Sequence, residues 1–470
     1  MKKDRIFFIF SLIFIFSLFF LAPLDTDLGW HLRYGEYFIK TGTILKTNIL
    51  TYYLNNYFWP NSYFLYQVIV YLVFKYFGYL GLAVGSSVLF SVCYLFFSRI
   101  HPKTPRINFL VFTVISIFSW QVFNLGLRAQ LFSFFFVILI FYIFEKSRKN
   151  TKYLFVIPPV FLLWTNLHGA FPLGLIVVLA LSIERILSEP SSRIMILGVL
   201  IITVFATLIN PYGTGPYFEG FLHITYPLGK LIAEWVPPEL LGKAIIISML
   251  FTSLYVFSLP QVKRKILWLS LLTIFGALSL MARRNIPYVA IVFSEAMFSA
   301  FNEKLINLEN NNTFRSISIS VLMLGLIYVP VFMLSKNYAE SVNSNSYCNN
   351  SFLVFPCQAA EFLKVMNIKN KNIFSNYEWG GYLEWNAPDN KYFVDGRMPT
   401  WPTPEKESPY SVFLYVIQAQ SNYESVLDKY KTDLILISSG SYLDIELQNN
   451  HTVWYEIYRD AVSVIYARKA

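Results

Sequence analysis

The sequence predicts a polytopic α-helical membrane protein that carries a small soluble α/β domain in its C-terminal part. Of its 470 residues, 55% are hydrophobic and only 14% are charged, whereas a soluble domain carries about 25% charged residues. Apolar runs of about 17–20 residues recur to residue 335, and such runs are long enough to cross a bilayer as helices. Beyond residue 335 these runs stop, and Asn, Ser, Asp and Lys become frequent.

The net charge of +10 does not indicate a nucleic-acid partner. Most Lys and Arg residues fall in short loops between apolar runs, where the positive-inside bias places them. The partner that these loops predict is the lipid bilayer, and the expected location is the plasma membrane. The sequence contains no Walker A, G-x-S-x-G, H-E-x-x-H or zinc-type cysteine pattern, which argues against an ATP-driven pump.

The first apolar run is expected to act as a retained signal-anchor. Lys2, Lys3 and Arg5 precede it and hold its start in the cytoplasm, and no small-residue cleavage site precedes Pro23. The first outer loop, 23–61, then emerges on the outer side of the membrane.

The short run Tyr63–Phe77 contains Lys75, and we expect it to lie along the membrane interface. With that assignment the later basic loops fall inside, about eleven helices cross the membrane, and the C-terminus is outside. The expected spans are Ile6–Ala22, Leu80–Phe97, Asn108–Phe123, Leu131–Phe144, Tyr153–Trp164, Pro172–Ile186, Ile194–Ile209, Ala244–Leu259, Ile266–Met281, Ile286–Phe301 and Ile317–Leu334.

The predicted division is therefore a transmembrane domain, 1–335, and an extracytoplasmic α/β domain, 336–470. Cys348 and Cys357 in the second domain either form a disulfide or remain two thiols. The helices expected there are Gln358–Met366, Ser411–Gln420 and Tyr423–Tyr430. The strands expected there are Asn372–Ser375, Tyr382–Trp385, Tyr392–Val394, Leu434–Ser438, Trp454–Tyr458 and Val462–Ala467.

Two carboxylates, Asp25 and Asp27, follow directly on the first span. A carboxylate at the outer bilayer surface could deprotonate an acceptor hydroxyl, or ligate a divalent cation such as Mg²⁺ or Mn²⁺ that bridges phosphate oxygens. The alternative is interfacial polarity, with Asp27 as the N-cap of a helix over Leu28–Thr41. On that helix His31 is four residues after Asp27 and shares its face.

Further ionisable residues are left on the same outer side by the predicted topology. Such groups are costly at membrane depth and tend to mark function. A guanidinium fork suits phosphate, and an acidic–aromatic pair suits a sugar ring. Helix-end snorkelling, helix capping and interfacial anchoring are the structural alternatives. The residues concerned are Arg128, His168, Glu234, Arg283 and Arg284.

The C-terminal part contains Trp379-Gly-Gly-Tyr-Leu and, further on, Asp395-Gly-Arg397. Paired glycines indicate a tight connection or a close approach of backbone, and Asp-Gly after a strand is a turn signal. These residues either hold the domain together by packing or cover the active site. We favour the structural role.

Together these motifs resemble the GT-C membrane glycosyltransferases, the group that contains protein O-mannosyltransferases, aminoarabinose transferases and oligosaccharyltransferases. The resemblance is nearest to uncharacterised prokaryotic members of that group, and it extends over nearly the whole length. The motifs that carry it are Asp25-Thr-Asp-Leu-Gly-Trp-His-Leu-Arg-Tyr-Gly-Glu36, Arg128-Ala-Gln-Leu-Phe, Trp164-Thr-Asn-Leu-His-Gly, Asn210-Pro-Tyr-Gly, Glu234-Trp, Arg284-Asn-Ile-Pro, Trp379-Gly-Gly-Tyr-Leu and Asp395-Gly-Arg.

The resemblance implies transfer of a hexose or pentose, with inversion, from a polyprenyl-phosphate-linked donor to a lipid, glycan or protein acceptor outside the membrane. It also implies a catalytic carboxylate in the first outer loop, followed in many relatives by Glu. Here Leu28 follows Asp27, so the match is imperfect. We prefer Asp27 as the catalytic residue, with Asp25 second.

The expected mechanism is a single displacement in which Asp27 orients or deprotonates the acceptor and the lipid phosphate leaves. The phosphate would be stabilised by Arg128, His168 and Arg283 or Arg284, and the substrate would also contact His31, Arg33, Glu36 and Glu234.

Two other functions remain open from the sequence. One is a transporter or flippase of lipid-linked sugars, which would need polar groups at mid-bilayer. The other is a cell-surface assembly protein that acts through its C-terminal domain. The expected spans are almost wholly apolar at their centres, which favours chemistry on one side of the membrane.

Overall fold

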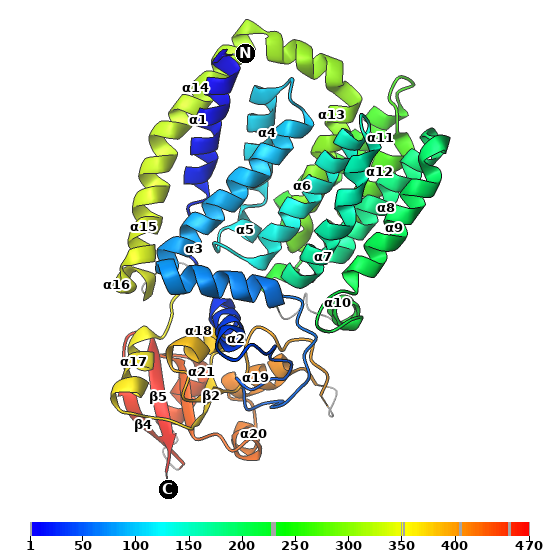
Figure 1. Cartoon of the computed structure of the whole chain (residues 1–470). Helices are drawn as coiled ribbons and strands as arrows, with labels where there is room; N and C mark the ends of the chain where they lie inside the picture. Colours follow the sequence, from blue (N-terminus) through cyan, green and yellow to red (C-terminus); the bar gives the residue numbers. More distant parts are fainter. Residues whose placement is uncertain are drawn as a thin grey trace. The chain divides into compact units, whose positions relative to one another are not determined.

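The computed structural model describes residues 2–226, 232–348, 350, 353–403, 407–449 and 453–469 (Figure 1). It divides the chain into two compact units. Unit 1 comprises Met1–Pro23, Tyr79–Gly220 and Pro227–Tyr338, and unit 2 comprises Leu24–Gly78, Phe221–Tyr226 and Ala339–Ala470. Leu24–Gly78 therefore groups with Ala339–Ala470 in one compact unit.

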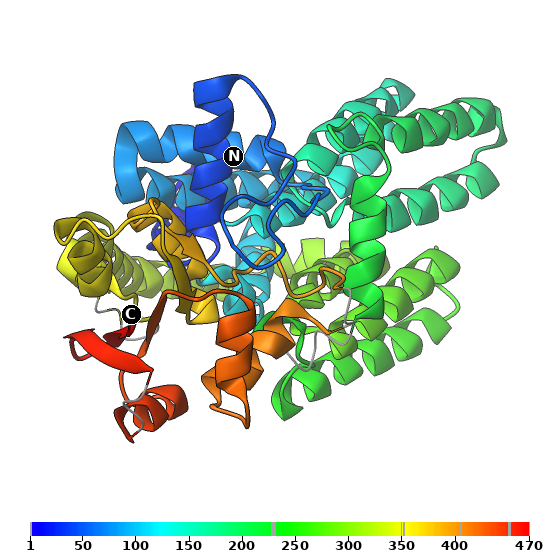
Figure 2. The same cartoon turned by 90° about the horizontal axis from the view of Figure 1, so that it is seen from below.

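In the described part, unit 1 consists of helices (Figures 1 and 2). A proline lies in the first turn of several of them, where its missing N–H costs no hydrogen bond. The elements are α1 (Lys2–Leu18), α4 (Pro105–Phe118), α5 (Trp120–Phe123), α6 (Ala129–Ser147), η1 (Thr151–Val156), α7 (Ile157–Leu167), α8 (Phe171–Ser188), η2 (Pro190–Ser192), α9 (Arg193–Thr207), η4 (Ala233–Trp235), α11 (Leu240–Ser258), α12 (Lys265–Met281), η5 (Arg283–Asn285), α13 (Ile286–Asn310), α14 (Asn312–Val329) and η6 (Pro330–Leu334).

Three further helices cross the boundary between the units: α3 (Phe64–Ile100), α10 (Gly215–Thr225) and α15 (Ser335–Val342). In α3 the backbone leaves the helical region at Gly78, where φ is 60° and ψ is −157°. Glycine is the residue that reaches this conformation without a steric penalty. The break falls between the run predicted to be interfacial and the run predicted to span the membrane.

Six segments in the described part are long and apolar enough to cross a membrane: Phe64–Ile100, Ala129–Ser147, Phe171–Ser188, Pro190–Thr207, Ala233–Ser258 and Asn312–Val342. Pro105–Phe118 and Lys265–Met281 are shorter apolar helices. Helices occupy each predicted span position, but the expected count of about eleven crossings is not confirmed. Large apolar side chains such as Ile194, Leu240 and Ile266 lie exposed on unit 1, as lipid contact requires.

Unit 2 contains a five-stranded sheet of order β2-β1-β3-β5-β4. The strand β1 pairs in parallel with β2 and β3, whereas β5 is antiparallel to both β3 and β4. The strands are β1 (Asn372–Ser375), β2 (Lys391–Tyr392), β3 (Leu434–Ser438), β4 (Trp454–Arg459) and β5 (Ser463–Arg468). The helices of this unit are α2 (Leu28–Thr41), α16 (Ser344–Cys348), α17 (Cys357–Val365), η7 (Tyr377–Trp379), α18 (Gly380–Asn386), α19 (Pro409–Ile417), α20 (Tyr423–Lys429) and α21 (Tyr442–Asn449).

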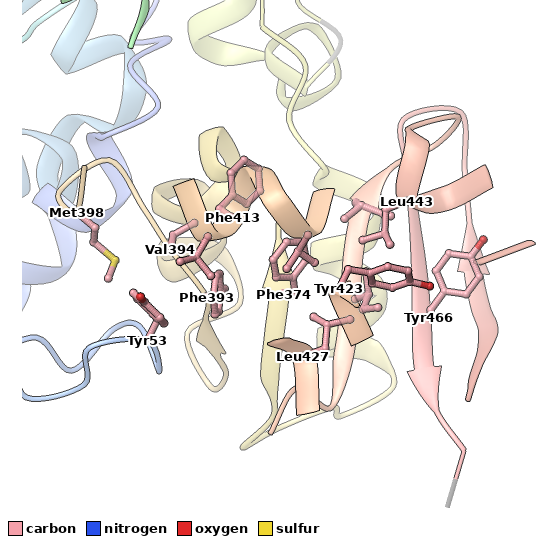
Figure 3. Packing of buried hydrophobic residues seen from close by; sticks show 14 of the residues in the cluster. Tyr53, Phe374, Phe393, Val394, Met398, Phe413, Tyr423, Leu427, Leu443 and Tyr466 are labelled. Atoms are coloured by element: carbon pink, nitrogen blue, oxygen red, sulfur yellow. The ribbon is translucent and has the colours of Figure 1, made fainter. Parts of the chain in front are cut away.

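The segment 24–61 contributes to this sheet and to its core. The backbone N–H of Tyr52 donates to the carbonyl of Tyr392 in β2 at 3.0 Å. Trp30 and Tyr53 from the loop segment share one hydrophobic cluster with Phe374 and Tyr466 from the sheet. Figure 3 shows part of this cluster. The two segments, separated by more than 250 positions in the sequence, therefore fold around a common core.

Most predicted elements of unit 2 are confirmed, and one is wrong. Leu28–Thr41 is a helix with the predicted bounds, and it ends at Gly42 in the left-handed region with φ of 69°. Tyr382–Trp385, expected as a strand, is part of α18. Trp379 and Leu383 are buried in the same hydrophobic cluster and are four residues apart, which is the spacing along one face of a helix. The run Tyr382–Trp385 is too short to show this spacing by itself.

Cys348 and Cys357 form a disulfide, which settles the alternative left open by the sequence. Both residues lie in unit 2, and the Tyr382 hydroxyl donates to the Cys357 sulfur at 3.0 Å. The cross-link joins α16 to the start of α17.

Replacing both cysteines with Ser should lower the free energy of unfolding of unit 2 by about 2–3 kcal/mol, because the unfolded chain regains the entropy that the cross-link removed. Thermal unfolding of the purified protein, followed by tryptophan fluorescence, measures this. Reductant should lower the midpoint of the wild type and leave that of the double variant unchanged. A wild-type midpoint insensitive to reductant would contradict the prediction.

Candidate functional site

Asp27 occupies the N-cap position of α2, in unit 2, with its carboxylate held by a neighbouring indole. Trp30 Nε1 donates to Asp27 Oδ1 at 3.1 Å, and the backbone N–H of Asp27 donates to Asp25 Oδ1 at 3.3 Å. Asp25 is buried, whereas Asp27 is half-buried. Of the two predicted catalytic carboxylates, Asp27 is the more accessible.

Three glycines, Gly29, Gly381 and Gly396, bring this segment against the 380–396 region of the same unit, and a fourth, Gly380, lies in a close contact within that region. A Cβ on Gly29 would overlap the carbonyl of Gly381, and one on Gly381 would overlap the carbonyl of Thr26. A Cβ on Gly380 would stand 2.5 Å from the carbonyl oxygen of Val394. The paired glycines of the sequence motif thus serve a close approach of backbone, one of the two roles expected for them.

Gly396 meets the candidate catalytic residue itself. A Cβ on Gly396 would overlap the carboxylate of Asp27. The Asp395-Gly-Arg397 turn therefore lies directly beside Asp27.

Arg397 is buried within unit 2 and bound on every side. Its Nε donates to Asp395 Oδ1 at 2.9 Å, its Nη1 to the Tyr34 hydroxyl at 2.7 Å, and its Nη2 to Asn48 Oδ1 at 3.1 Å. Three aromatic rings surround the guanidinium, with centroids 5.4–5.7 Å away: those of Tyr34, Trp59 and Trp401. These contacts support the structural role that the sequence favoured for Arg397.

Glu384 from α18 completes this buried cluster, 3.7 Å from Arg397 Nη2. Burial, and then the negative charge of Asp395, raise the pKa of the Glu384 carboxyl well above its ordinary value near 4.5. The opposite charge next to Arg397 in this cluster comes from Asp395, with which Arg397 forms an ion pair.

Three predicted substrate-binding residues on α2 have clear local environments. Glu36 pairs with Arg33 at 2.5 Å and with Lys40 at 2.6 Å along the same helix. The His31 ring is buried, with its centroid 3.5 Å from that of Trp30 and 4.7 Å from that of Tyr66. Arg33 and Glu36 thus partly neutralise each other's charge, and His31 packs against the rings of Trp30 and Tyr66.

In unit 1 the structure brings together four of the residues that the sequence assigned to phosphate and sugar. Arg128, the N-cap residue of α6, forms an ion pair with Glu234 in η4. Gln130 Nε2 donates to the other oxygen of Glu234 at 2.9 Å. The Arg284 guanidinium in η5 lies 4.5 Å from the ring centroid of Trp235. Helix ends distant in sequence thereby converge on one polar cluster.

His168 joins this cluster through its charge environment and a hydrogen-bonded chain. Trp164 Nε1 donates to Ser133 Oγ at 2.7 Å, and Ser133 Oγ lies 2.6 Å from His168 Nδ1. Burial, and then the positive charges of Arg284 and Arg128, hold the pKa of His168 well below its ordinary value of 6.5. His168 is therefore neutral at neutral pH and serves as a hydrogen-bonding group without charge.

A pocket opens at this cluster, with an empty volume of about 310 Å³ that includes space open to solvent. His168, Gln130 and Arg284 give it polar groups, while phenylalanine and leucine side chains give it apolar walls. Arg284 contributes to the lining, whereas Arg283 is not among the lining residues and donates its backbone N–H to Val236. A pocket in which several polar groups converge beside apolar side chains is a candidate ligand site.

Sequence reasoning missed Ser133 and Tyr288, which contact or line this site. Both lie within apolar runs read as membrane spans. Ser133 follows Gln130 by one helical turn, and Tyr288 follows Arg284 by four residues, so helical spacing from the charged residues could have singled them out.

A metal site at Asp25 and Asp27 was one sequence-based expectation. No group of three or more His, Cys, Asp or Glu side chains in the described ranges is placed to hold an ion. Mg²⁺ in proteins is commonly held by one or two carboxylates together with substrate phosphates and waters, so Asp25 and Asp27 stay a predicted site for such an ion.

The raised pKa of Glu384 predicts how pH acts on unit 2. Above pH 4.5 the Glu384 carboxyl of the native state keeps a proton that the unfolded chain releases. The contribution of Glu384 to the free energy of unfolding is therefore full below pH 4.5 and is lost as pH rises toward the pKa in the folded state. Glu384→Gln should therefore lose less thermal stability than the wild type between pH 5 and pH 8. Thermal melts of both proteins across this range test it, and parallel curves would contradict it.

The comparisons with known proteins show the fold. No protein-family model matches the sequence, and no curated protein matches it. Among solved structures, the oligosaccharyltransferase of Archaeoglobus fulgidus is similar in three states. With a tethered acceptor peptide containing the NVT sequon, the TM-score is 0.59 at 13% identity, covering 100% of this chain and 74% of that one.

The same enzyme, the archaeal oligosaccharyltransferase AglB, in complex with an inhibitory peptide and a dolichol-phosphate gives a TM-score of 0.59 at 11% identity. Its apo form gives 0.59 at 12% identity, and in both cases 99% of this chain and 74% of the other are covered. Over its whole length the chain thus has the fold of these oligosaccharyltransferase structures.

Proposed function

We propose that this protein is a membrane glycosyltransferase that moves a sugar from a polyprenyl-phosphate-linked donor to an acceptor on the outer face of the membrane. The observation that carries the proposal is the fold shared along the whole chain with an oligosaccharyltransferase, one of whose structures holds dolichol-phosphate. The apolar helices of unit 1 suit a donor with a lipid tail.

The polar cluster of unit 1 is assigned to the donor phosphate. Arg284 lines the pocket with a guanidinium, and Arg128 lies in the same cluster, paired with Glu234. Neutral His168 adds a hydrogen-bonding group without adding charge. These groups would stabilise the negative charge that grows on the phosphate as the bond to the sugar breaks.

Asp27 in unit 2 is assigned to the acceptor. Its half-buried carboxylate is oriented by Trp30 and can accept the proton of an acceptor hydroxyl. In the single displacement, the acceptor oxygen forms a bond to the anomeric carbon, the bond from that carbon to the phosphate oxygen breaks, and the polyprenyl phosphate leaves with the electron pair. A single displacement inverts the anomeric configuration.

Asp27→Asn should reduce transfer from a polyprenyl-phosphate sugar by a factor of at least 100, because the amide cannot take up the acceptor proton. Purified protein in nanodiscs with radiolabelled lipid-linked sugars measures this. Asp25→Asn is the matched comparison and should retain more activity, since Asp25 is buried and bonded to the Asp27 backbone. Undiminished transfer by Asp27→Asn would exclude it as the base.

Arg284→Gln should raise the donor KM about 10- to 100-fold, because a hydrogen bond to a charged group contributes about 1.5–3 kcal/mol. Arg283→Gln is the matched change at the adjacent position outside the pocket lining, and its effect should be smaller. Initial rates over a range of donor concentrations separate the two variants. Equal effects at the two positions would contradict the assignment of the pocket to the phosphate.

A further inference from the structure

We infer that Gly396 is a positioning residue, whose missing side chain sets the orientation of the Asp27 carboxylate. This inference rests on the proposed function, in which Asp27 acts on the acceptor. It assigns to the Asp395-Gly-Arg397 turn a role in the reaction, in addition to its role in holding unit 2 together.

The contact itself is specific to the carboxylate. The three atoms nearest to a Cβ on Gly396 are Oδ1, Cγ and Oδ2 of Asp27, with Oδ2 at 3.2 Å. Gly396 does not have a left-handed backbone, so the turn does not require glycine for its conformation. The requirement for glycine at this position is therefore one of space beside Asp27.

The backbone of the turn at Gly396 cannot easily withdraw from this contact. Asp27 is held on one side by Trp30 Nε1, at the start of α2. Gly396 lies between Asp395 and Arg397, both fully buried, and Arg397 is bonded to Tyr34 on the same helix. A methyl group added at Gly396 would consequently act on the Asp27 side chain, which can rotate, before it moved the backbone.

The other close glycines provide an internal contrast. The nearest atoms to a Cβ on Gly29, Gly380 or Gly381 are backbone carbonyl oxygens, which cannot rotate away. Substitution at those positions should destabilise unit 2. Substitution at Gly396 should leave the fold intact and displace the Asp27 carboxylate. Measurements of stability and of turnover therefore distinguish the two kinds of glycine.

The experiment compares Gly396→Ala, Gly381→Ala and Gly198→Ala in the full chain, with nothing within 4 Å of a Cβ at Gly198 in unit 1. Thermal midpoint, kcat and donor KM are measured with a polyprenyl-phosphate sugar. Gly396→Ala should keep the wild-type midpoint and donor KM, while kcat falls at least tenfold. Gly381→Ala should lower the midpoint, and Gly198→Ala should match the wild type in every quantity.

Trp30→Phe is the second variant, because it removes the indole N–H on the other side of the carboxylate and keeps an aromatic ring. It should also lower kcat at constant donor KM. Wild-type kcat in either Gly396→Ala or Trp30→Phe would overturn the inference. So would a Gly396→Ala protein that fails to fold, since the methyl would then have moved the backbone.

Failure of the inference and failure of the proposed function give different results. If Asp27→Asn is inactive while Gly396→Ala is normal, only the positioning role is lost. If Asp27→Asn is fully active, the role of Asp27 in the proposed function is lost.

Discussion

Arg397 carries a positive charge at a position that is closed to solvent, and the arrangement of unit 2 follows from how that charge is compensated. Moving an ion out of water costs several kcal/mol, and the cost is offset only when hydrogen bonds and an opposite charge are all in place. Asp395 supplies the opposite charge, Tyr34 and Asn48 accept hydrogen bonds, and three aromatic rings surround the guanidinium. These partners come from α2, from the residues that follow it up to Trp59 and from the C-terminal segment, so the network fixes all three together. Asp27, the N-cap residue of the same helix, is therefore also held in position by this network.

Unit 1 also contains charged groups in an apolar environment. There the charge is limited by ion pairing and by a histidine that stays neutral. Arg128 and Glu234 balance each other, with Gln130 satisfying the second carboxylate oxygen. Burial and the nearby arginines keep His168 neutral, so the cluster does not accumulate a third positive charge. Arg284 is left lining the pocket against Trp235. A site of this composition suits an anion whose charge increases during the reaction, because its donors are already oriented before the charge appears.

Much of this architecture could be predicted from the sequence because the signals are local. The helix after Asp27 has a polar residue before it and a glycine after it, and both of its ends were predicted correctly. The charge of the loops predicts that Arg128, His168, Glu234 and Arg284 lie on one side of the membrane, and that side stays a prediction. The structure then placed the four residues in one cluster, although their roles remain predictions.

What the sequence could not show depends on contacts between distant segments. The strand predicted over Tyr382–Trp385 is a helix because its buried face is set by Trp379 and Leu383, and a short aromatic run fits either period. The glycine contacts were visible in the sequence only as Gly-Gly and Asp-Gly pairs. Their partners, Thr26 and Asp27, lie more than 350 positions away, and no local pattern connects them.

The most direct test of the central claim is an experimental structure of the protein with a polyprenyl-phosphate analogue bound in nanodiscs. The proposed function predicts phosphate density within hydrogen-bonding distance of Arg284 or His168, at the pocket of unit 1. Phosphate bound elsewhere on the protein, with this pocket filled only by solvent, would contradict the assignment of the pocket to the lipid-linked donor.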